Sequence, residues 1–180
     1  MIRPPPLVLR SLVVAVVFGS VLSGCPAKTE GGLLLTVTLE AGVRGDCVVV
    51  EGFEDGRRRV RSAVARDAAR TEYFAGISRG DFPASMTWQA SAVQGRCGDD
   101  ATWKLSSRSP EVTKAFPSSG VESFALTIGQ PDATLDGDRD TFVDVQKGGT
   151  DCDDTNAAVK PGVPQDCASS VDTNCDGKLF

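Results

Sequence analysis

The residues with the clearest chemistry are acidic and lie in three clusters near the C-terminus. Each cluster places Asp or Asn at alternating positions of a short segment: Asp136, Asp138, Asp140 and Asp144; Asp151, Asp153, Asp154 and Asn156; and Asp172, Asn174 and Asp176. In a tight turn this spacing directs several side-chain oxygens toward one point, and Ca²⁺ takes about six to eight oxygen ligands. We therefore expect these residues to bind a cation, with Ca²⁺ as a structural cofactor.

Two of the clusters match part of an EF-hand calcium loop. The first supplies acids at positions 1, 3, 5 and 9 of that loop, and residues 172–177 supply positions 1, 3, 5 and 6. In the first cluster, however, Thr141 stands at the position of the usual Gly and Lys147 at that of the bidentate Glu. The sequence thus predicts irregular cation-binding loops. One such cluster alone is equally compatible with a solvated acidic turn.

The negative charge of the chain is concentrated in the same region. Residues 132–180 contain eleven Asp, no Glu and four basic residues, whereas residues 25–131 contain thirteen acidic and thirteen basic residues. This asymmetry favours divalent cations as partners and argues against nucleic acid. With few apolar residues, the acidic segment is expected to be largely disordered until a cation binds.

The chain contains six cysteines and no histidine. Cys47 and Cys97 are predicted to form a disulfide, which closes a loop of about 50 residues and contributes about 4 kcal/mol in the chain-entropy model. In the acidic segment, the sequence favours a bridge from Cys167 to either Cys175 or Cys152, and the choice between these two stays open.

Residues 151–167 and 172–177 resemble the metal-binding repeat of MopE-type bacterial surface proteins, in which DCDDxNxxVxPGxxExC is followed by DxNCDG. The resemblance covers residues 136–177 and implies that 132–180 is an extracellular, cation-binding segment. Three departures from the family pattern are Gln165 for the usual Glu, Arg139 for a loop Gly, and Ala168-Ser-Ser for the usual Asp-Gly.

The available donor atoms bear on which metal binds. MopE-type proteins are associated with copper, so a copper-scavenging or copper-homeostasis protein is an alternative function. Copper(I) prefers thiolate, thioether or imidazole ligands, yet the chain has no His and its single Met after residue 24 is Met86. The carboxylates favour Ca²⁺, and a zinc site on the three tail cysteines lacks a fourth ligand of the usual kind.

The N-terminus has the layout of an export signal. Arg3 and Arg10 flank an apolar run at 12–22 that is followed by Ser-Gly-Cys25. The run is shorter than the roughly 20 residues of a transmembrane helix, although an uncleaved membrane anchor is the alternative. Leu22-Ser-Gly-Cys25 resembles the bacterial lipobox, which implies a lipoprotein signal peptide at 1–24 and lipidation of Cys25. Pro26 in place of Asp favours the outer membrane or cell surface over the inner membrane.

Residues 33–131, after a tether at 25–32, predict an all-β domain. Apolar and polar residues alternate in short segments separated by Gly, Asp and Pro. These segments are 33–40, 47–53, 59–65, 71–77, 83–93, 102–106 and 121–128. They indicate an Ig-like β-sandwich followed by an irregular Asp/Cys-rich metal-binding tail. Trp88 is expected in the core, and 57–69 is alternatively helical because Ala and Arg favour helices.

The absence of His removes the Ser-His and Cys-His pairs of common hydrolases. We therefore expect a non-catalytic, lipid-anchored cell-surface protein with a calcium-stabilised C-terminal motif. A glycan- or protein-binding module is the other alternative, because the loops of β-sandwiches support such contacts.

Overall fold

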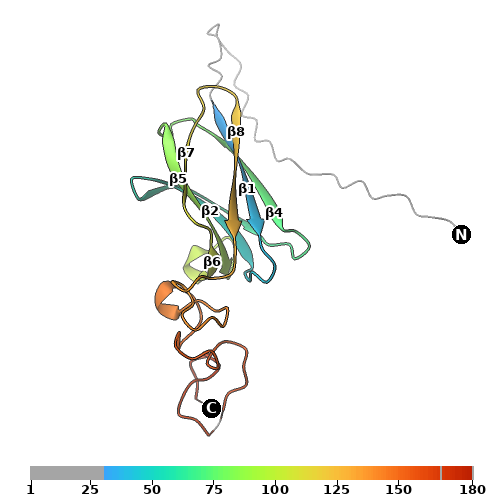
Figure 1. The fold of residues 1–180 in the computed structure, drawn as a ribbon, viewed down its shortest axis with the longest axis vertical. Helices are drawn as coiled ribbons and strands as arrows, with labels where there is room; N and C mark the ends of the chain where they lie inside the picture. Colours follow the sequence, from blue (N-terminus) through green and yellow to red (C-terminus); the bar gives the residue numbers. More distant parts are fainter. Residues whose placement is uncertain (1–30, 167, 180) are drawn as a thin grey trace, which may run out of the picture.

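Two β-sheets followed by an irregular C-terminal segment make up the part of the protein that the computed structural model describes, residues 31–166 and 168–179 (Figure 1). The strands are β1 (Gly32–Leu39), β2 (Cys47–Glu54), β3 (Arg57–Ala65), β4 (Glu72–Ser78), β5 (Ser85–Gln94), β6 (Lys104–Arg108), β7 (Val112–Ala115) and β8 (Val121–Ile128). Two 3₁₀ turns, η1 (Asp100–Thr102) and η2 (Val145–Lys147), complete the elements. In these ranges no helix is long and apolar enough to cross a membrane. The predicted signal peptide and Cys25 lie outside the described residues.

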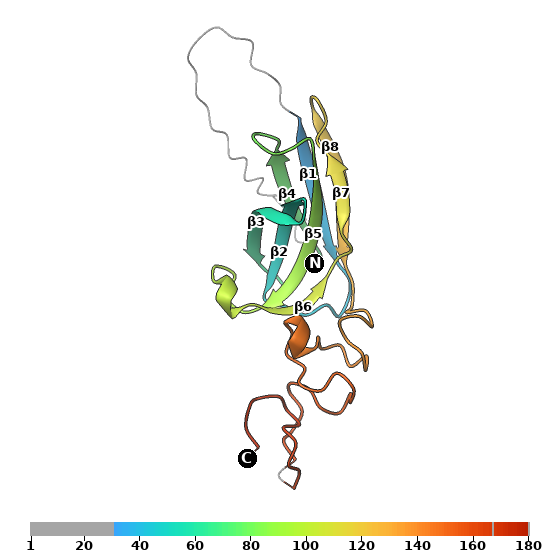
Figure 2. The same ribbon diagram turned by 90° about the vertical axis from the view of Figure 1, so that its left-hand side faces the viewer.

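The strands are divided between a three-stranded and a five-stranded sheet. The first has the order β4-β1-β8, and the second has the order β3-β2-β5-β6 with β7 also paired to β5. β1 runs antiparallel to β4 but parallel to β8, so that Gly32 lies opposite Val121 and Leu39 opposite Ile128. The chain therefore enters and leaves this sheet in the same direction, and the C-terminal segment extends from one end of the sandwich (Figure 2).

The alternation of apolar residues along the strands builds one core between the sheets. In β1 the buried residues are Leu33, Leu35, Val37 and Leu39. On β5, Trp88 is 1% exposed and its ring lies 6.4 Å from that of Phe116 and 6.2 Å from that of Phe124. Gly52 of β2 leaves room for this indole, because a Cβ at that position would lie 2.7 Å from Trp88 Cζ3. The prediction that Trp88 belongs to the core is confirmed.

The all-β prediction is also confirmed, and its helical alternative for 57–69 is wrong because that segment contains β3. β3 forms an edge of its sheet, where Val60 packs against the core and Arg58 and Arg61 reach Glu51 of the neighbouring β2 at 3.2 and 2.8 Å. Cross-strand pairing thus outweighs helix propensity here. All seven predicted segments overlap a strand, and β7 was not predicted. The Ig-like topology stays a prediction.

The predicted Cys47–Cys97 disulfide is present, with the two Cα atoms 5.5 Å apart. It ties the start of β2 to the loop that follows β5. Cys47 is fully buried and packs with Val49 and Val93 in a small second apolar cluster on the outer side of the five-stranded sheet. The bridge therefore fastens the end of the sandwich that lies near the C-terminal segment.

The C-terminal segment has a small apolar centre and is attached to the sandwich. Its buried apolar residues are Leu135, Val143 and Val159. The Leu105 amide of β6 donates a hydrogen bond to the Gly148 carbonyl at 2.7 Å, and the Arg44 guanidinium lies 4.0 Å above the ring of Phe142. These contacts hold the first half of the irregular tail against the end of the sheets.

Candidate metal centre

The first acidic cluster forms a loop in which backbone amides bind the carboxylates. Asp136 accepts hydrogen bonds from the amides of Asp140 at 3.2 Å and Thr141 at 2.8 Å. Asp138 Oδ1 accepts from the Asp140 amide at 3.1 Å, and Asp140 Oδ1 accepts from the Phe142 amide at 2.8 Å. The amides thereby fix the direction of each carboxylate and leave the other oxygens of Asp138 and Asp140 available.

The three carboxylates of this loop converge. One oxygen each of Asp136, Asp138 and Asp140 lies within 4.8 Å of the others. Asp136 is 2% exposed and Asp140 8%. Burial raises the pKa of Asp138; a hydrogen bond from the Asp140 amide opposes this, and the charges of Asp140 and Asp136 raise the pKa further. These acids repel one another in a poorly solvated place, where a cation would offset the repulsion.

Asp151 is a fourth buried carboxylate, outside this group of three but acted on by its charges. It is fully buried, and its Oδ2, like that of Asp138 and of Asp140, accepts no hydrogen bond from any described residue. Burial raises its pKa, and among the neighbouring charges those of Asp140 and Asp138 raise it most. Because such effects fall with distance, Asp151 lies within electrostatic range of the first loop. Buried polar atoms are normally hydrogen-bonded, so these three buried carboxylate oxygens, which accept no hydrogen bond from a described residue, fit a bound cation.

A tight turn delivers Asp151 to this position. Asp144 caps η2 by accepting a backbone amide, and the turn then closes on the Val143 carbonyl, which accepts hydrogen bonds from the amides of Thr150 and Asp151 at 2.9 Å each. Gly149 passes so close that a Cβ there would lie 1.9 Å from the Val143 oxygen. Glycine at 149 is therefore required for the turn that brings the fourth carboxylate to the loop.

Other acids near this turn are bound by protein groups. The Gly137 amide donates to Asp154 Oδ1 at 2.7 Å and Lys147 Nζ donates to Asp154 Oδ2 at 2.9 Å, and these two contacts lower the pKa of Asp154. Lys147 also lies 3.7 Å from Asp144 Oδ2. Asp154 and Asp144 thus already have a positive partner.

Two further predicted ligands stabilise turns. Asp153 Oδ1 accepts the hydroxyl of Thr155 at 2.7 Å, and Asn156 Oδ1 accepts the amide of Ala158 at 3.3 Å. Of the eight predicted ligands between 136 and 156, the structure groups Asp136, Asp138 and Asp140, and the charges of Asp138 and Asp140 act on the buried Asp151. We call these four residues site 1. The remaining four, Asp144, Asp153, Asp154 and Asn156, lie in the turns next to it.

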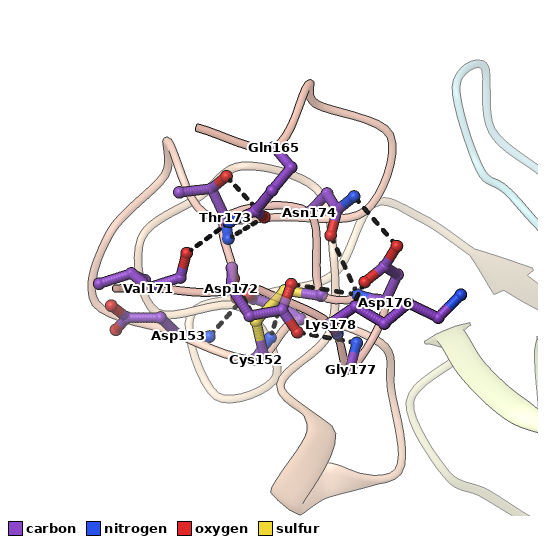
Figure 3. Close-up of a disulfide and its surroundings, with 12 residues drawn as sticks. Cys152, Asp153, Gln165, Val171, Asp172, Thr173, Asn174, Asp176, Gly177 and Lys178 are labelled. Carbon is purple, nitrogen blue, oxygen red and sulfur yellow. Dashed lines mark hydrogen bonds between the residues drawn. A yellow bond between two sulfur atoms is a disulfide. The ribbon is translucent and has the colours of Figure 1, made fainter. Parts of the chain in front are cut away.

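The third cluster, which we call loop 2 (residues 172–177), repeats the hydrogen-bond pattern of the first (Figure 3). Asp172 accepts from the amides of Asp176 at 3.3 Å and Gly177 at 2.8 Å. Asn174 Oδ1 accepts from the Asp176 amide at 3.3 Å, and Asp176 Oδ1 from the Lys178 amide at 2.8 Å. Loop 2 has an amide in place of the middle carboxylate, and Asp176 is exposed. It therefore has the shape of the first loop with less charge and less burial.

The two loops also share an unusual backbone conformation. Arg139 and Thr141 have φ angles of 64° and 75°, and the corresponding Cys175 and Gly177 have 55° and 82°. This left-handed conformation costs residues other than Gly about 1–2 kcal/mol. Because three of the four residues are not Gly, the carboxylate–amide hydrogen bonds must hold the loops in this shape. Arg139, a departure from the family pattern, adopts the conformation that a Gly would take without strain.

The disulfide of the tail joins Cys152 to Cys175, with Cα atoms 5.6 Å apart, so the predicted bridges from Cys167 to either residue are wrong. The physical reason is the path of the chain. The Lys160 amide donates to the Thr173 carbonyl at 3.0 Å, which folds the end of the segment back toward residue 152. Since Cys152 directly follows the fourth carboxylate of site 1, the disulfide links loop 2 covalently to that site. Cys167 lies outside the described residues.

A shallow hollow of about 320 Å³ lies on the five-stranded sheet near Gly148. Three of its four charged side chains pair with one another: Arg61 bonds Glu51 at 2.8 Å and also bonds Asp100, and it lies 5.0 Å above the ring of Trp103. With these three side chains occupied, the hollow offers less binding chemistry than site 1.

Comparison of the chain with protein-family models, with curated proteins and with solved structures finds no match. The MopE-type resemblance accordingly stays a prediction.

Sequence reasoning missed one charged residue at this site. Lys160 Nζ lies 3.7 Å from Asp140 Oδ2. Nothing in the spacing of residues 140 and 160 indicates this contact, because it depends on the irregular path between them. Val143 and Val159 are buried in the same segment. As apolar residues among polar ones, they could have been predicted to form a small apolar centre.

Proposed function

We propose that the protein is a non-catalytic, lipid-anchored protein of the bacterial cell surface whose C-terminal segment binds Ca²⁺ at site 1. Loop 2 is a second, weaker cation loop. The anchor is the lipid on Cys25, an assignment supported by the basic flank, the apolar run and the Leu-Ser-Gly-Cys motif. The sandwich connects the anchor to the cation-binding segment.

The observation that carries the proposal is the set of buried Oδ2 atoms of Asp138, Asp140 and Asp151, none of which accepts a hydrogen bond from a described residue. The Asp140 side chain is fully shielded from solvent, as is the whole of Asp151. Burying several ionised carboxylates without compensation costs several kcal/mol per group, to order of magnitude. A divalent cation bound by these oxygens would offset that cost.

The donor atoms favour Ca²⁺. Site 1 offers carboxylate oxygens, which suit hard cations, and Ca²⁺ accepts irregular arrangements that the smaller, strictly octahedral Mg²⁺ does not. Four of the cysteines are disulfide-bonded and the chain has no His, so the soft ligands that copper prefers are scarce.

Calcium in this proposal has a structural effect. At about 1 mM Ca²⁺ and a dissociation constant of about 10⁻⁴ M, linkage contributes about 1.4 kcal/mol per ion to the stability of the bound form. A segment held mainly by turns and a small apolar centre is sensitive to a contribution of this size, whereas the sandwich is not.

Calorimetric titration of the chain from residue 25 onward, with Cys25→Ser to omit the lipid, tests the proposal. We expect Ca²⁺ to bind, and Asp140→Asn and Asp151→Asn each to weaken binding about tenfold or more because each removes a ligand charge. Asp81→Asn, which changes an exposed carboxylate between β4 and β5, is the matched control and leaves binding unchanged. Absence of calcium binding by the unsubstituted chain would overturn the proposal.

Limited proteolysis gives a second readout. Chelation with EDTA is expected to expose cleavage sites after Asp132 while the sandwich stays resistant. Equal digestion with and without EDTA would contradict a structural role for the cation. Stoichiometric copper that survives a weak chelator would favour the copper-handling alternative.

A further inference from the structure

Lys160 places a positive charge beside site 1. Its Nζ lies 3.7 Å from Asp140 Oδ2, one of the three unpartnered oxygens, and the Asp140 side chain is fully buried. The distance is too long for a hydrogen bond. The ammonium therefore acts on this oxygen through its charge and leaves the lone pairs free for a cation.

The backbone holds Lys160 in place independently of its side chain. Its amide donates to the Thr173 carbonyl at 3.0 Å, and the preceding Val159 is buried and donates its own amide to the Asn156 carbonyl at 2.8 Å. The side chain is 28% exposed, so its charge lies at the border between the site and solvent. Substituting the side chain would thus remove the charge and keep these contacts.

Lys147, the other lysine near the site, has a different role. It hydrogen-bonds Asp154 at 2.9 Å and lies 3.7 Å from Asp144, and neither of these oxygens belongs to the unpartnered set. Three oxygens of site 1 accept no hydrogen bond from a described residue. Among the ion pairs of the described residues, only the Lys160–Asp140 pair involves one of them.

We propose that Lys160 is a built-in competitor of the cation: its ammonium partly neutralises site 1 before binding and lowers the affinity of the site for Ca²⁺. The inference depends on the proposed function. Four carboxylates are a large negative charge for one divalent ion, and the affinity of calcium sites rises with the number of ligand charges. A fixed positive charge nearby repels the incoming cation and shifts its binding to higher concentrations.

Calcium titration of Lys160→Met, compared with the unsubstituted chain, tests this inference. We expect Lys160→Met to bind Ca²⁺ about tenfold more tightly because the repulsive charge is gone. Lys160→Arg, which keeps the charge, should bind like the unsubstituted chain. Lys114→Met is the matched control. It removes the same charge from β7, where Lys114 pairs with Glu122.

Proteolysis in EDTA separates competition from a purely structural role. Without calcium, Lys160→Met should be cleaved faster in the tail because Asp140 has lost its counter-charge, although its calcium affinity is higher. If Lys160 had a structural role alone, its loss would lower both the protease resistance of the tail and the calcium affinity. Should Lys160→Met fail to fold, Lys160→Gln removes the same charge with a polar side chain and carries the same expectation.

If folded Lys160→Met or Lys160→Gln bound calcium as tightly as the unsubstituted chain, or more weakly, the role of Lys160 would be overturned and the proposed function left intact. No calcium binding by the unsubstituted chain would instead overturn the proposed function itself. The two failures are therefore distinguishable in one set of titrations.

Discussion

The sandwich and the C-terminal segment bury different kinds of side chain. In the sandwich the most buried residues are apolar, such as Trp88 and Leu35 at 1% and 0% exposure. In the tail, Asp136 and Asp151 are as deeply buried, at 2% and 0%, as the apolar Val143 at 1%. The stabilisation from apolar burial changes little with ordinary changes of ion concentration and pH, whereas the energy of buried carboxylates depends on both. Two adjoining regions of one chain should therefore react differently to the same treatment.

The largest expected effect comes from removing the centre of the apolar core. Trp88→Ala should lower the free energy of unfolding of the sandwich by about 3–5 kcal/mol, because it leaves a cavity between Phe116 and Phe124. Phe74→Ala is the control, since Phe74 is 67% exposed and its loss should change the stability by about 0.5 kcal/mol or less. Urea unfolding followed by circular dichroism, with and without calcium, measures both. If the loss of stability in Trp88→Ala depended on calcium, the stability of the sandwich would not be independent of the tail.

The two disulfides should act on different regions. Removing Cys47–Cys97, with a separation of 50 residues, is expected to cost the sandwich about 4 kcal/mol in the chain-entropy model. Removing Cys152–Cys175, with a separation of 23, should cost the tail about 3 kcal/mol and leave the unfolding of the sandwich unchanged. Urea unfolding of the Cys→Ala double variants reads the first effect and protease resistance the second. A shift of sandwich unfolding in Cys152→Ala/Cys175→Ala would contradict the division.

A smaller effect is expected from pH. The pKa values of Asp138 and Asp151 lie above the ordinary 3.8 in the fold, so these two groups hold more protons in the folded tail than in the unfolded one just above pH 3.8. These two groups therefore destabilise the cation-free tail as pH rises through that window, while Asp132 and Asp154, with lowered pKa values, act in the opposite sense. Because Ca²⁺ displaces protons from the raised pair, its stabilisation should be larger near pH 7 than near pH 4.5.

Protease protection by calcium at the two pH values measures this difference. The unfolding of the sandwich serves as the internal control, because its main apolar cluster contains no such acids. Calcium protection that is equal at both pH values would show that Asp138 and Asp151 do not bind the cation as carboxylates.

The two regions also differ in how far their sequence predicts them. Period-two alternation indicated β1 and β5 because each strand has one face in the core. β7 was missed, since four residues next to Pro110 and Phe116 are too short for a clear alternation. In the sandwich, two cysteines allowed a single internal pair, and that pair is present.

The tail was predictable in composition and not in connectivity. Acid spacing predicted that Asp136, Asp138 and Asp140 lie together, as they do, because side chains at i, i+2 and i+4 of a tight loop share one side. That Asp151 joins this loop, that Cys152 meets Cys175 and that Lys160 reaches Asp140 all depend on a path without regular periodicity. Long-range contacts of this kind leave no local pattern in a single sequence.

The parallel pairing of β1 with β8 determines how the protein would stand on a membrane with the proposed lipid on Cys25. The lipid proposed on Cys25 would hold the Gly32 end of β1 near the surface, while the tail departs from the Leu39 end. Eight residues of strand span about 26 Å at roughly 3.3 Å per residue. With the lipid on Cys25 as proposed, the sandwich would be a spacer of several Debye lengths at roughly 8 Å each, and site 1 would lie in the ion concentrations of the surrounding medium, beyond the field of the lipid headgroups.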